Sequence, residues 1–169
     1  PVDGAALLTT LAETFATYVV LPPGGKDLLA LWTLHTYALD ATQVSPILGL
    51  TSPQKRCGKT TVLSILRAVV WKPLPASNIT PAAVFRTIEK CAPTLLVDEA
   101  DTFMGKNEEL RGVLNSGHTR ALAYVVRTAG EDHEPRQFST WCPKAIALIG
   151  TLPDTLHDRT ITLPLKRRT

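Results

Sequence analysis

The sequence contains few of the residues that mark several large classes of protein. Of its 169 residues, 3 are cysteine, 6% are aromatic and 20% are charged. Three scattered cysteines are too few for a disulfide framework or a zinc site, so we expect a reduced, cytoplasmic compartment. No apolar run approaches the roughly 18 residues that span a bilayer, and no signal peptide is visible. The sequence therefore predicts no membrane association.

The residues that are present suit one compact folded domain. Hydrophobic residues make up 44% of the chain, which is enough for a buried core. The net charge of +3 permits contact with nucleic acid but does not argue for it. Because the chain starts at Pro1 and stops at "LKRRT", we expect it to be a domain of a longer polypeptide.

Apolar periodicity predicts strands that alternate with helices. Continuous apolar runs predict strands at 46–52, 94–101, 144–151 and 160–165. Helical spacing predicts helices at 5–20, 26–41, 60–71, 80–91 and 107–117, with a short one within 151–159. Runs at 121–128 and 137–142 predict a hairpin. Apolar strands that alternate with helices are typical of a mostly parallel sheet covered on both faces, so we expect an α/β fold. We divide it into an N-terminal helical segment, 1–45, packed on a core of 46–169.

The stretch "SPQKRCGKTT" at 52–61 places Gly58-Lys59-Thr60 between a predicted strand and a predicted helix. This is the end of a phosphate-binding loop, G-x-x-x-x-G-K-[ST], with Pro53 in place of the first glycine. In such a loop, backbone N–H groups and the helix N-terminus bind phosphates. Lys59 would reach the β- and γ-phosphates, and Thr60 would bind Mg²⁺. Pro53 lies at the edge of the loop, where a missing N–H costs least.

The loop supplies the candidate nucleotide-binding residues. They are Gln54, Lys55, Arg56, Cys57, Gly58, Lys59, Thr60 and Thr61. Lys55 and Arg56 either add positive charge near the phosphates or point to solvent. Cys57 is either a small filler residue or, beside Lys59, a reactive thiolate.

Asp98 and Glu99 follow the apolar run "LLV" and complete the motif. One carboxylate there can hold Mg²⁺, and the next can polarise an attacking water. Taken alone, the pair would equally suit a helix cap or a solvated strand end. With the loop upstream, it predicts ATP and Mg²⁺ as cofactors, with Thr60 and Asp98 at the metal. No N-K-x-D guanine signature and no dinucleotide-binding G-x-G-x-x-G after a strand is present. "EDHE" at 131–134 looks metal-like, but its place between two strands favours a solvated hairpin tip.

With these motifs the chain resembles an AAA+ type P-loop ATPase. More narrowly, it resembles an ATPase domain of uncharacterised function in replication proteins of phages, plasmids and other mobile elements, often attached to primase or helicase modules. The resemblance covers roughly residues 28–168 and rests on "LWTLHTY", "SPQKRCGKTTVL", "PTLLVDEADTF", "ELRGVLNSGH", "PKAIALIGTLPDTLHDRTI" and "LKRR". It implies a three-layer αβα sandwich with a five-stranded parallel sheet. In that sheet a sensor strand, 144–151, separates the Walker A and Walker B strands. Because the chain ends soon after the last strand, we expect it to lack the helical lid that is usual in this family.

The resemblance also adds two catalytic residues to Glu99. Thr151 matches the polar sensor that orients water near the γ-phosphate, where related helicases commonly carry asparagine. Arg159 matches the arginine that reaches the nucleotide of a neighbouring subunit. Its alternative role is a surface ion pair with Asp154 or Asp158.

We therefore expect the ATP-hydrolysing motor of a helicase-like protein that replicates phage or mobile-element DNA. The full-length protein would form a homo-oligomeric, hexamer-like ring on single-stranded DNA or within a replication complex, and the isolated fragment would be monomeric. The alternative is a switch or scaffold that binds ATP without moving on DNA. A third hypothesis, a nucleic-acid-binding module without nucleotide chemistry, requires that the two motifs occur together by chance. Basic residues at 55–56, 119–136 and 166–168 suit a DNA backbone or a solvated surface. With aromatic content of 6%, exposed aromatics for base stacking are not evident.

Overall fold

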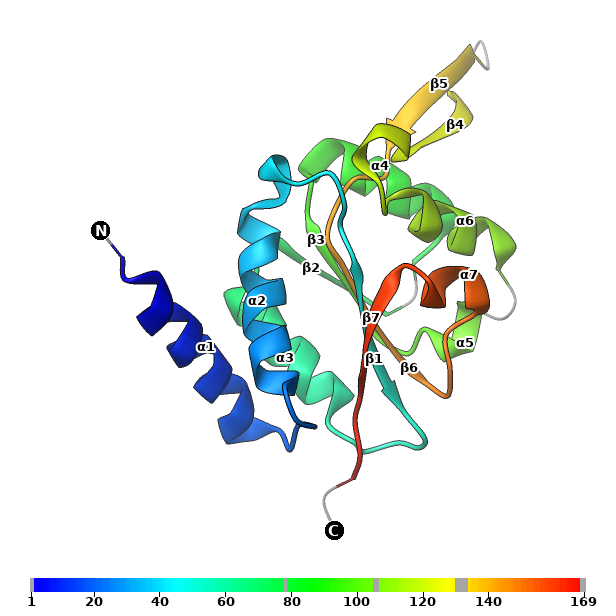
Figure 1. Ribbon diagram of the computed structural model, residues 1–169. Helices are drawn as coiled ribbons and strands as arrows, with labels where there is room; N and C mark the ends of the chain where they lie inside the picture. The colour runs from blue at the N-terminus through cyan, green and yellow to red at the C-terminus, as the bar shows by residue number, and fades with distance from the viewer. Residues whose placement is uncertain (1, 78, 105–106, 130–133, 168–169) are drawn as a thin grey trace.

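A computed structural model describes residues 2–77, 79–104, 107–129 and 134–167 (Figure 1). The α-helices are α1 (Gly4–Tyr18), α2 (Gly25–Tyr37), α3 (Lys59–Val69), α4 (Pro81–Cys91), α5 (Asp101–Met104), α6 (Glu108–Ser116) and α7 (Asp154–His157). The strands are β1 (Ile47–Ser52), β2 (Pro73–Ala76), β3 (Thr94–Val97), β4 (Tyr124–Ala129), β5 (Glu134–Ser139), β6 (Lys144–Ile149) and β7 (Thr160–Pro164). Two 3₁₀ turns, η1 (Leu39–Ala41) and η2 (Arg120–Leu122), complete the order. The predicted α/β class is confirmed.

Five strands form one parallel sheet in the order β2-β3-β6-β1-β7. Strand β6 lies between β1 and β3, with Ala147 opposite Leu50 and Ala145 opposite Leu96. The expected five-stranded parallel sheet is confirmed, as is the separation of β1 from β3 by the strand at 144–149. Because parallel strands end at the same edge, the carboxyl ends of β1, β3 and β6 meet there.

Helices cover both faces of this sheet (Figure 1). Along β6, Ala145 and Ala147 pack with α2 and α3 and with the end of α1, whereas Ile146 and Leu148 pack with α4, α6 and α7. Burial on both faces explains why β6 is apolar throughout instead of alternating. The arrangement is compatible with a three-layer α/β sandwich.

The edge strand β2 was not predicted, because its sequence, "PLPA", contains two prolines. Ala76 directs its carbonyl toward β3, where it accepts a hydrogen bond from the N–H of Asp98. Since backbone groups of alternate residues point to the same side, Pro73 and Pro75 face the outer edge. Proline has no N–H, so the prolines that hide the strand in the sequence also end the sheet there.

Strands β4 and β5 form the predicted antiparallel hairpin, which projects from the α4 and α6 side of the fold (Figure 1). Phe138 stacks on Phe85 of α4, with ring centroids 4.8 Å apart. Arg127 forms an ion pair with Glu109 of α6 at 3.0 Å. Most of the expected hairpin tip, residues 131–133, lies outside the described residues, so the tip interpretation stays a prediction.

The surface corrects one expectation from composition. Tyr18, Tyr37, Trp71 and Tyr124 are all exposed, so the expected lack of exposed aromatics is wrong. Few aromatic residues are present, but several of them face solvent. Within the described ranges, none of the helices combines the length and the apolar character needed to cross a membrane.

Candidate functional site

A cleft of about 390 Å³ opens at the carboxyl edge of the sheet. Its lining residues are Lys55, Arg56, Lys59, Thr60, Asp98, Glu99, Asp101, Thr102 and Ile149. All but the last three were predicted as site residues. The two sequence motifs therefore meet in one cavity, because β1 and β3 end at the same edge.

Lys59 is buried at the first position of α3, after the loop 53–58 that follows β1. Gly58 caps this helix with a φ of +89°, a conformation that favours glycine. The Lys59 ammonium donates to the hydroxyl of Ser52, which in turn donates to the carbonyl of Gln54 at 2.7 Å. In the described part of the chain, Lys59 forms no ion pair. Buried charges are normally paired, so this ammonium at a helix N-terminus is suited to an anion from outside the chain.

Thr60 and Asp98 line the cleft side by side. The Thr60 hydroxyl donates to Asp98 Oδ2 at 3.0 Å, and the N–H of Glu99 donates to Asp98 Oδ1 at 2.9 Å. Glu99 has a φ of +54°, which is strained for a residue with a side chain. Such strain is often stored at functional sites, and here it directs an exposed carboxylate along the cleft wall.

Helix α5 joins the acidic segment to the end of β6. Asp101 accepts a hydrogen bond from the N–H of Ile149 at 3.1 Å, and Thr102 donates to the carbonyl of Glu99 at 2.8 Å. Sequence analysis missed both side chains, although the third carboxylate of "VDEAD" was a usable signal. The predicted sensor, Thr151, is exposed two residues beyond Ile149 and does not line the cleft. Its role stays a prediction.

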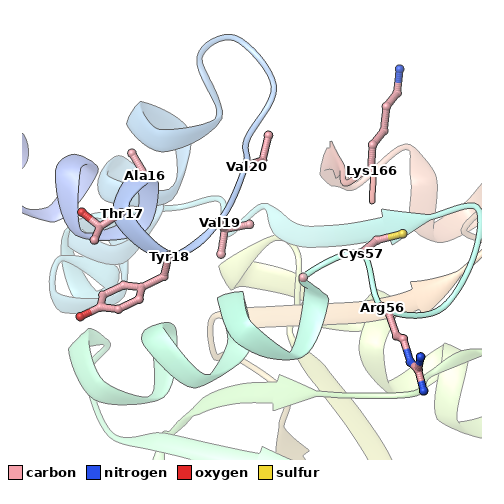
Figure 2. A pocket seen from close by; sticks show the side chains of 9 residues that line it. Ala16, Thr17, Tyr18, Val19, Val20, Arg56, Cys57 and Lys166 are labelled. Atoms are coloured by element: carbon pink, nitrogen blue, oxygen red, sulfur yellow. The ribbon is translucent and has the colours of Figure 1, made fainter. Parts of the chain in front are cut away.

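A second pocket, of about 440 Å³, adjoins the same loop on its other side (Figure 2). It is lined by Ala16, Thr17, Tyr18, Val19, Val20, Arg56, Cys57, Gly58 and Lys166. Val19, just after α1, packs against Gly58, where an added Cβ would lie 3.2 Å from Val19 Cγ1. Arg56 lines both cavities, and in Figure 2 it points away from Lys166. Of the other predicted loop residues, Cys57 is buried, while Gln54 and Thr61 line neither cavity.

Arg159 does not reach the cleft. Its carbonyl accepts from the N–H of Ile47, the first residue of β1, whereas the cleft lies at the other end of that six-residue strand. Strand geometry separates the two ends by about 17 Å. The Arg159 guanidinium donates to the carbonyl of Thr155 at 2.6 Å. Among the described residues it forms no ion pair, so the alternative pairing with Asp154 or Asp158 is absent.

Metal binding at the cleft depends on a small set of oxygen atoms. No group of three His, Cys, Asp or Glu residues suited to a metal occurs in the ranges that the structure covers. The Thr60 hydroxyl and the Asp98 carboxylate, 3.0 Å apart, still match the preference of Mg²⁺ for one or two protein oxygens plus water and phosphate. The donor set thus fits Mg²⁺ held together with a nucleotide.

None of the models of known protein families matches this chain, and neither does any curated protein. The function is therefore inferred from the geometry of the cleft and from the sequence motifs within it.

Proposed function

We propose that this chain is an ATP-binding and ATP-hydrolysing domain of the AAA+ P-loop type. One observation carries the proposal: the buried ammonium of Lys59, which forms no ion pair among the described residues, shares a cleft with the hydrogen-bonded pair of Thr60 and Asp98. Lys59 and Thr60 begin α3, the helix after β1, and Asp98 follows β3; β1 and β3 are not neighbours in the sheet. The convergence of these three side chains at one helix N-terminus is what a metal–triphosphate group requires.

The two cavities divide the nucleotide between them. Lys59 and the first N–H groups of α3 bind the β- and γ-phosphates in the cleft, and Lys55 adds positive charge at its rim. The pocket beside Val19 and Gly58 takes the base and ribose. Arg56, which lines both cavities, lies at the α-phosphate between them.

Thr60 and Asp98 would hold Mg²⁺ in the cleft. When bound, the ion neutralises charge on the phosphate oxygens. Asp98 is oriented for this by the N–H of Glu99, which fixes one of its oxygens and leaves the other beside Thr60.

Glu99 acts as the general base. Its exposed carboxylate takes a proton from a water molecule as the water oxygen bonds to the γ-phosphorus and the bond to ADP breaks. Thr102 holds the Glu99 carbonyl, and Asp101 ties the same segment to β6. These two side chains therefore hold the backbone segment that carries the general base.

Calorimetry on the Lys59→Ala variant tests the proposal. Loss of a charge-assisted contact worth roughly 1.5–3 kcal/mol should reduce Mg-ATP affinity by about 10- to 150-fold, to the point where binding is no longer detected. Lys90→Ala is the matched control, because Lys90 is exposed on α4 and lines neither cavity. Equal affinity of the Lys59→Ala variant and the parent protein would overturn the proposal.

We further propose that the domain is the motor of a phage or mobile-element DNA replication protein. The resemblance of the motifs supports this, and the exposed Tyr124 on the projecting hairpin is suited to stacking on a base. ATP turnover of the full-length protein should rise with single-stranded DNA, and binding should weaken steeply with salt as phosphate contacts release counterions. ATP turnover with no DNA affinity at low salt would favour the switch or scaffold instead.

A further inference from the structure

Two exposed aromatic side chains contact each other at the amino edge of the sheet, away from the cleft. Tyr37, the last residue of α2, and Trp71, which lies two residues beyond α3, are 57% and 49% exposed. Their ring centroids are 5.7 Å apart. Because Trp71 comes just before β2 begins, the pair lies at the opposite edge of the parallel sheet from the cleft. We call Tyr37, Trp71 and the adjacent Lys72 the aromatic cluster.

Hydrogen bonds hold both rings of the aromatic cluster in place. The Tyr37 hydroxyl donates to the carbonyl of Val69 at 2.9 Å. The N–H of Trp71 donates to the hydroxyl of Thr36 at 3.1 Å, and its carbonyl accepts from the hydroxyl of Thr94 at 2.5 Å. Both threonines are buried, so the backbone of Trp71 is anchored in the protein interior. Aromatic rings that are already ordered lose little conformational freedom when they bind a ligand.

Lys72 gives this surface its charge. Its ammonium lies 5.5 Å from the centroid of the Trp71 ring and donates to the carbonyl of Cys91 at 3.5 Å. It forms no ion pair with any residue that the structure describes. Lys72 also has a φ of +43°, a strained conformation of a kind that is often found at functional sites. A cation without an acidic partner thus lies beside an exposed indole ring.

A second cation links the aromatic cluster to the projecting hairpin. The Arg120 guanidinium donates to the carbonyl of Asp40 at 2.6 Å, about one helical turn beyond Tyr37. Within the described ranges, Arg120 also forms no ion pair. It begins η2, which leads to Tyr124, the exposed first residue of β4. Aromatic and basic groups therefore follow one another from the aromatic cluster to the hairpin.

This combination suits a single strand of nucleic acid better than an apolar protein surface. A nucleotide carries a flat base next to a charged phosphate, so it can use the Trp71 ring and the Lys72 ammonium together. An apolar partner would remove water from the ammonium without pairing it, which costs free energy. The bases of a duplex already stack on one another, so a single strand is the form that offers free base faces.

We propose that the aromatic cluster is a second contact site for single-stranded DNA, in addition to the hairpin. Bases stack on Trp71 and Tyr37. Lys72 and Arg120 bind phosphates, and the strand continues to Tyr124. This inference rests on the proposed DNA function and not on ATP hydrolysis. Because the aromatic cluster and the cleft lie at opposite edges of the sheet, DNA and nucleotide do not compete for one site.

Tryptophan fluorescence of the full-length protein with an oligo-dT strand tests the stacking. Of the three tryptophans in this chain, Trp32 is buried and Trp141 is half-buried, so Trp71 is the most open to a base. The oligonucleotide should quench part of the emission, and Trp71→Phe should remove that part. The phenyl ring can still stack, so this variant should keep most of the affinity.

Affinity for a labelled oligo-dT strand, measured by fluorescence anisotropy, is the second readout. Trp71→Ala should weaken binding by roughly 5- to 100-fold, as expected for the loss of one stacked base. Lys72→Ala should reduce the slope of log affinity against log salt by about 0.7, as expected for one lost phosphate contact. Leu31→Ala, which removes an exposed side chain from the same helix as Tyr37, is the matched control and should bind like the parent. Mg-ATP affinity should be unchanged in all of these variants.

Each other outcome has a distinct meaning. If the strand binds but the emission and the affinities of all variants match the parent, the inference is wrong while the proposed DNA function stands. If no strand binds at low salt, the DNA function and this inference fail together, and the proposed ATPase activity is unaffected. A duplex that binds equally well and causes the same quenching would overturn the stacking. If the variants lose self-association in sedimentation but keep DNA affinity, the aromatic cluster is a protein interface and the inference is overturned.

Discussion

A cationic side chain lies at each end of β1, but the charges around the two side chains differ. At the cleft, Lys59 shares its cavity with three carboxylates of its own chain, those of Asp98, Glu99 and Asp101. The opposite end of β1 has a pocket that we call the far-end pocket. Its lining residues, none of which carries a carboxylate, are Gly112, Asn115, Ser116, His118, Thr119, Leu122 and Arg159. The cleft has both the acids and the cation that a metal–nucleotide needs. The lining of the far-end pocket has no acidic side chain to balance Arg159, which suits an anion. The two ends of β1 therefore suit different ligands: a metal–nucleotide at the cleft and an anion at the far-end pocket.

Both ends are fixed by the same two central strands. The carbonyl of Ser52, at the cleft, accepts from the N–H of Gly150 at 2.9 Å, just past the end of β6. The same strand β6 begins with Lys144, whose ammonium donates to the carbonyls of Thr140 and Cys142 at the far end. Buried, paired strands do not bend easily, so the spacing between cleft and far-end pocket is set by the sheet.

Loss of Arg159 should have the largest effect on turnover. A guanidinium that stabilises charge on the γ-phosphate oxygens contributes roughly 10³- to 10⁵-fold, so Arg159→Ala should reduce the ATPase rate of the full-length protein by that order. The matched control is Arg136→Ala, an exposed arginine on β5 that lines neither site. A steady-state phosphate-release assay measures both variants.

A mixing experiment decides whether this arginine acts on its neighbour. Arg159→Ala and Lys59→Ala should each be inactive, and the mixture should regain part of the rate, because some interfaces pair an intact Lys59 with an intact Arg159. If both variants are inactive and mixing restores no activity, Arg159 acts on the nucleotide of its own copy or is needed only for the fold. Normal turnover by Arg159→Ala would show that Arg159 takes no part in ATP hydrolysis in any copy.

Glu99→Gln should have the next largest effect, and only at the cleft. The amide keeps the shape of the carboxylate but cannot take a proton, so turnover should fall by roughly 10²- to 10⁴-fold while Mg-ATP affinity is retained. Turnover assays and calorimetry on the same sample separate the two quantities. Hydrolysis at the parent rate would show that another group is the base.

The cleft could be predicted from sequence because parallel strands share an edge. Lys59 and Asp98 each follow an apolar run, and two such runs in one parallel sheet must end together. Thr102 and Asp101 were missed because their roles depend on the turn of α5 after β3, which the pattern does not describe. The edge strand β2 was missed because its two prolines are signals against a strand.

The far-end pocket could not be predicted from local patterns. His118 and Arg159 come from segments far apart in the chain, and each is placed by a backbone hydrogen bond to the start of β1. Such bonds depend on the path of the chain and not on side-chain type. Lys144 begins the predicted strand 144–151, but the pattern does not reveal that its side chain is fully buried against backbone carbonyls.

Gly117→Ala should test the rigidity of the far end. A Cβ at Gly117 would lie 2.1 Å from the Lys144 ammonium and 2.2 Å from the carbonyl of Thr140, so either the buried lysine or the backbone must move. Overpacking of this kind should lower the free energy of unfolding by about 3 kcal/mol in urea denaturation. Gly112→Ala is the control on the same helix, since nothing lies within 4 Å of its Cβ, and it should be neutral or stabilising. Equal stability of the two variants would mean that Lys144 can move away from Gly117 at little cost in free energy.

Arg56→Gly should have the smallest effect, and it isolates strain at the cleft end. Arg56 has a φ of +62°, a conformation that costs a residue with a side chain about 1–2 kcal/mol, whereas glycine's greater loss of freedom on folding costs about 0.5–1 kcal/mol. The matched variant, Arg56→Ala, loses the same guanidinium but keeps the strained backbone. Both should bind Mg-ATP more weakly than the parent to a similar degree, because the group that lines both cavities is gone. In urea denaturation the glycine variant should be more stable than the alanine variant by about 0.5–1 kcal/mol. If the two are equally stable, the loop stores no strain at Arg56. If they are equally stable and also bind Mg-ATP like the parent, Arg56 points to solvent, and phosphate binding depends on Lys59 and α3.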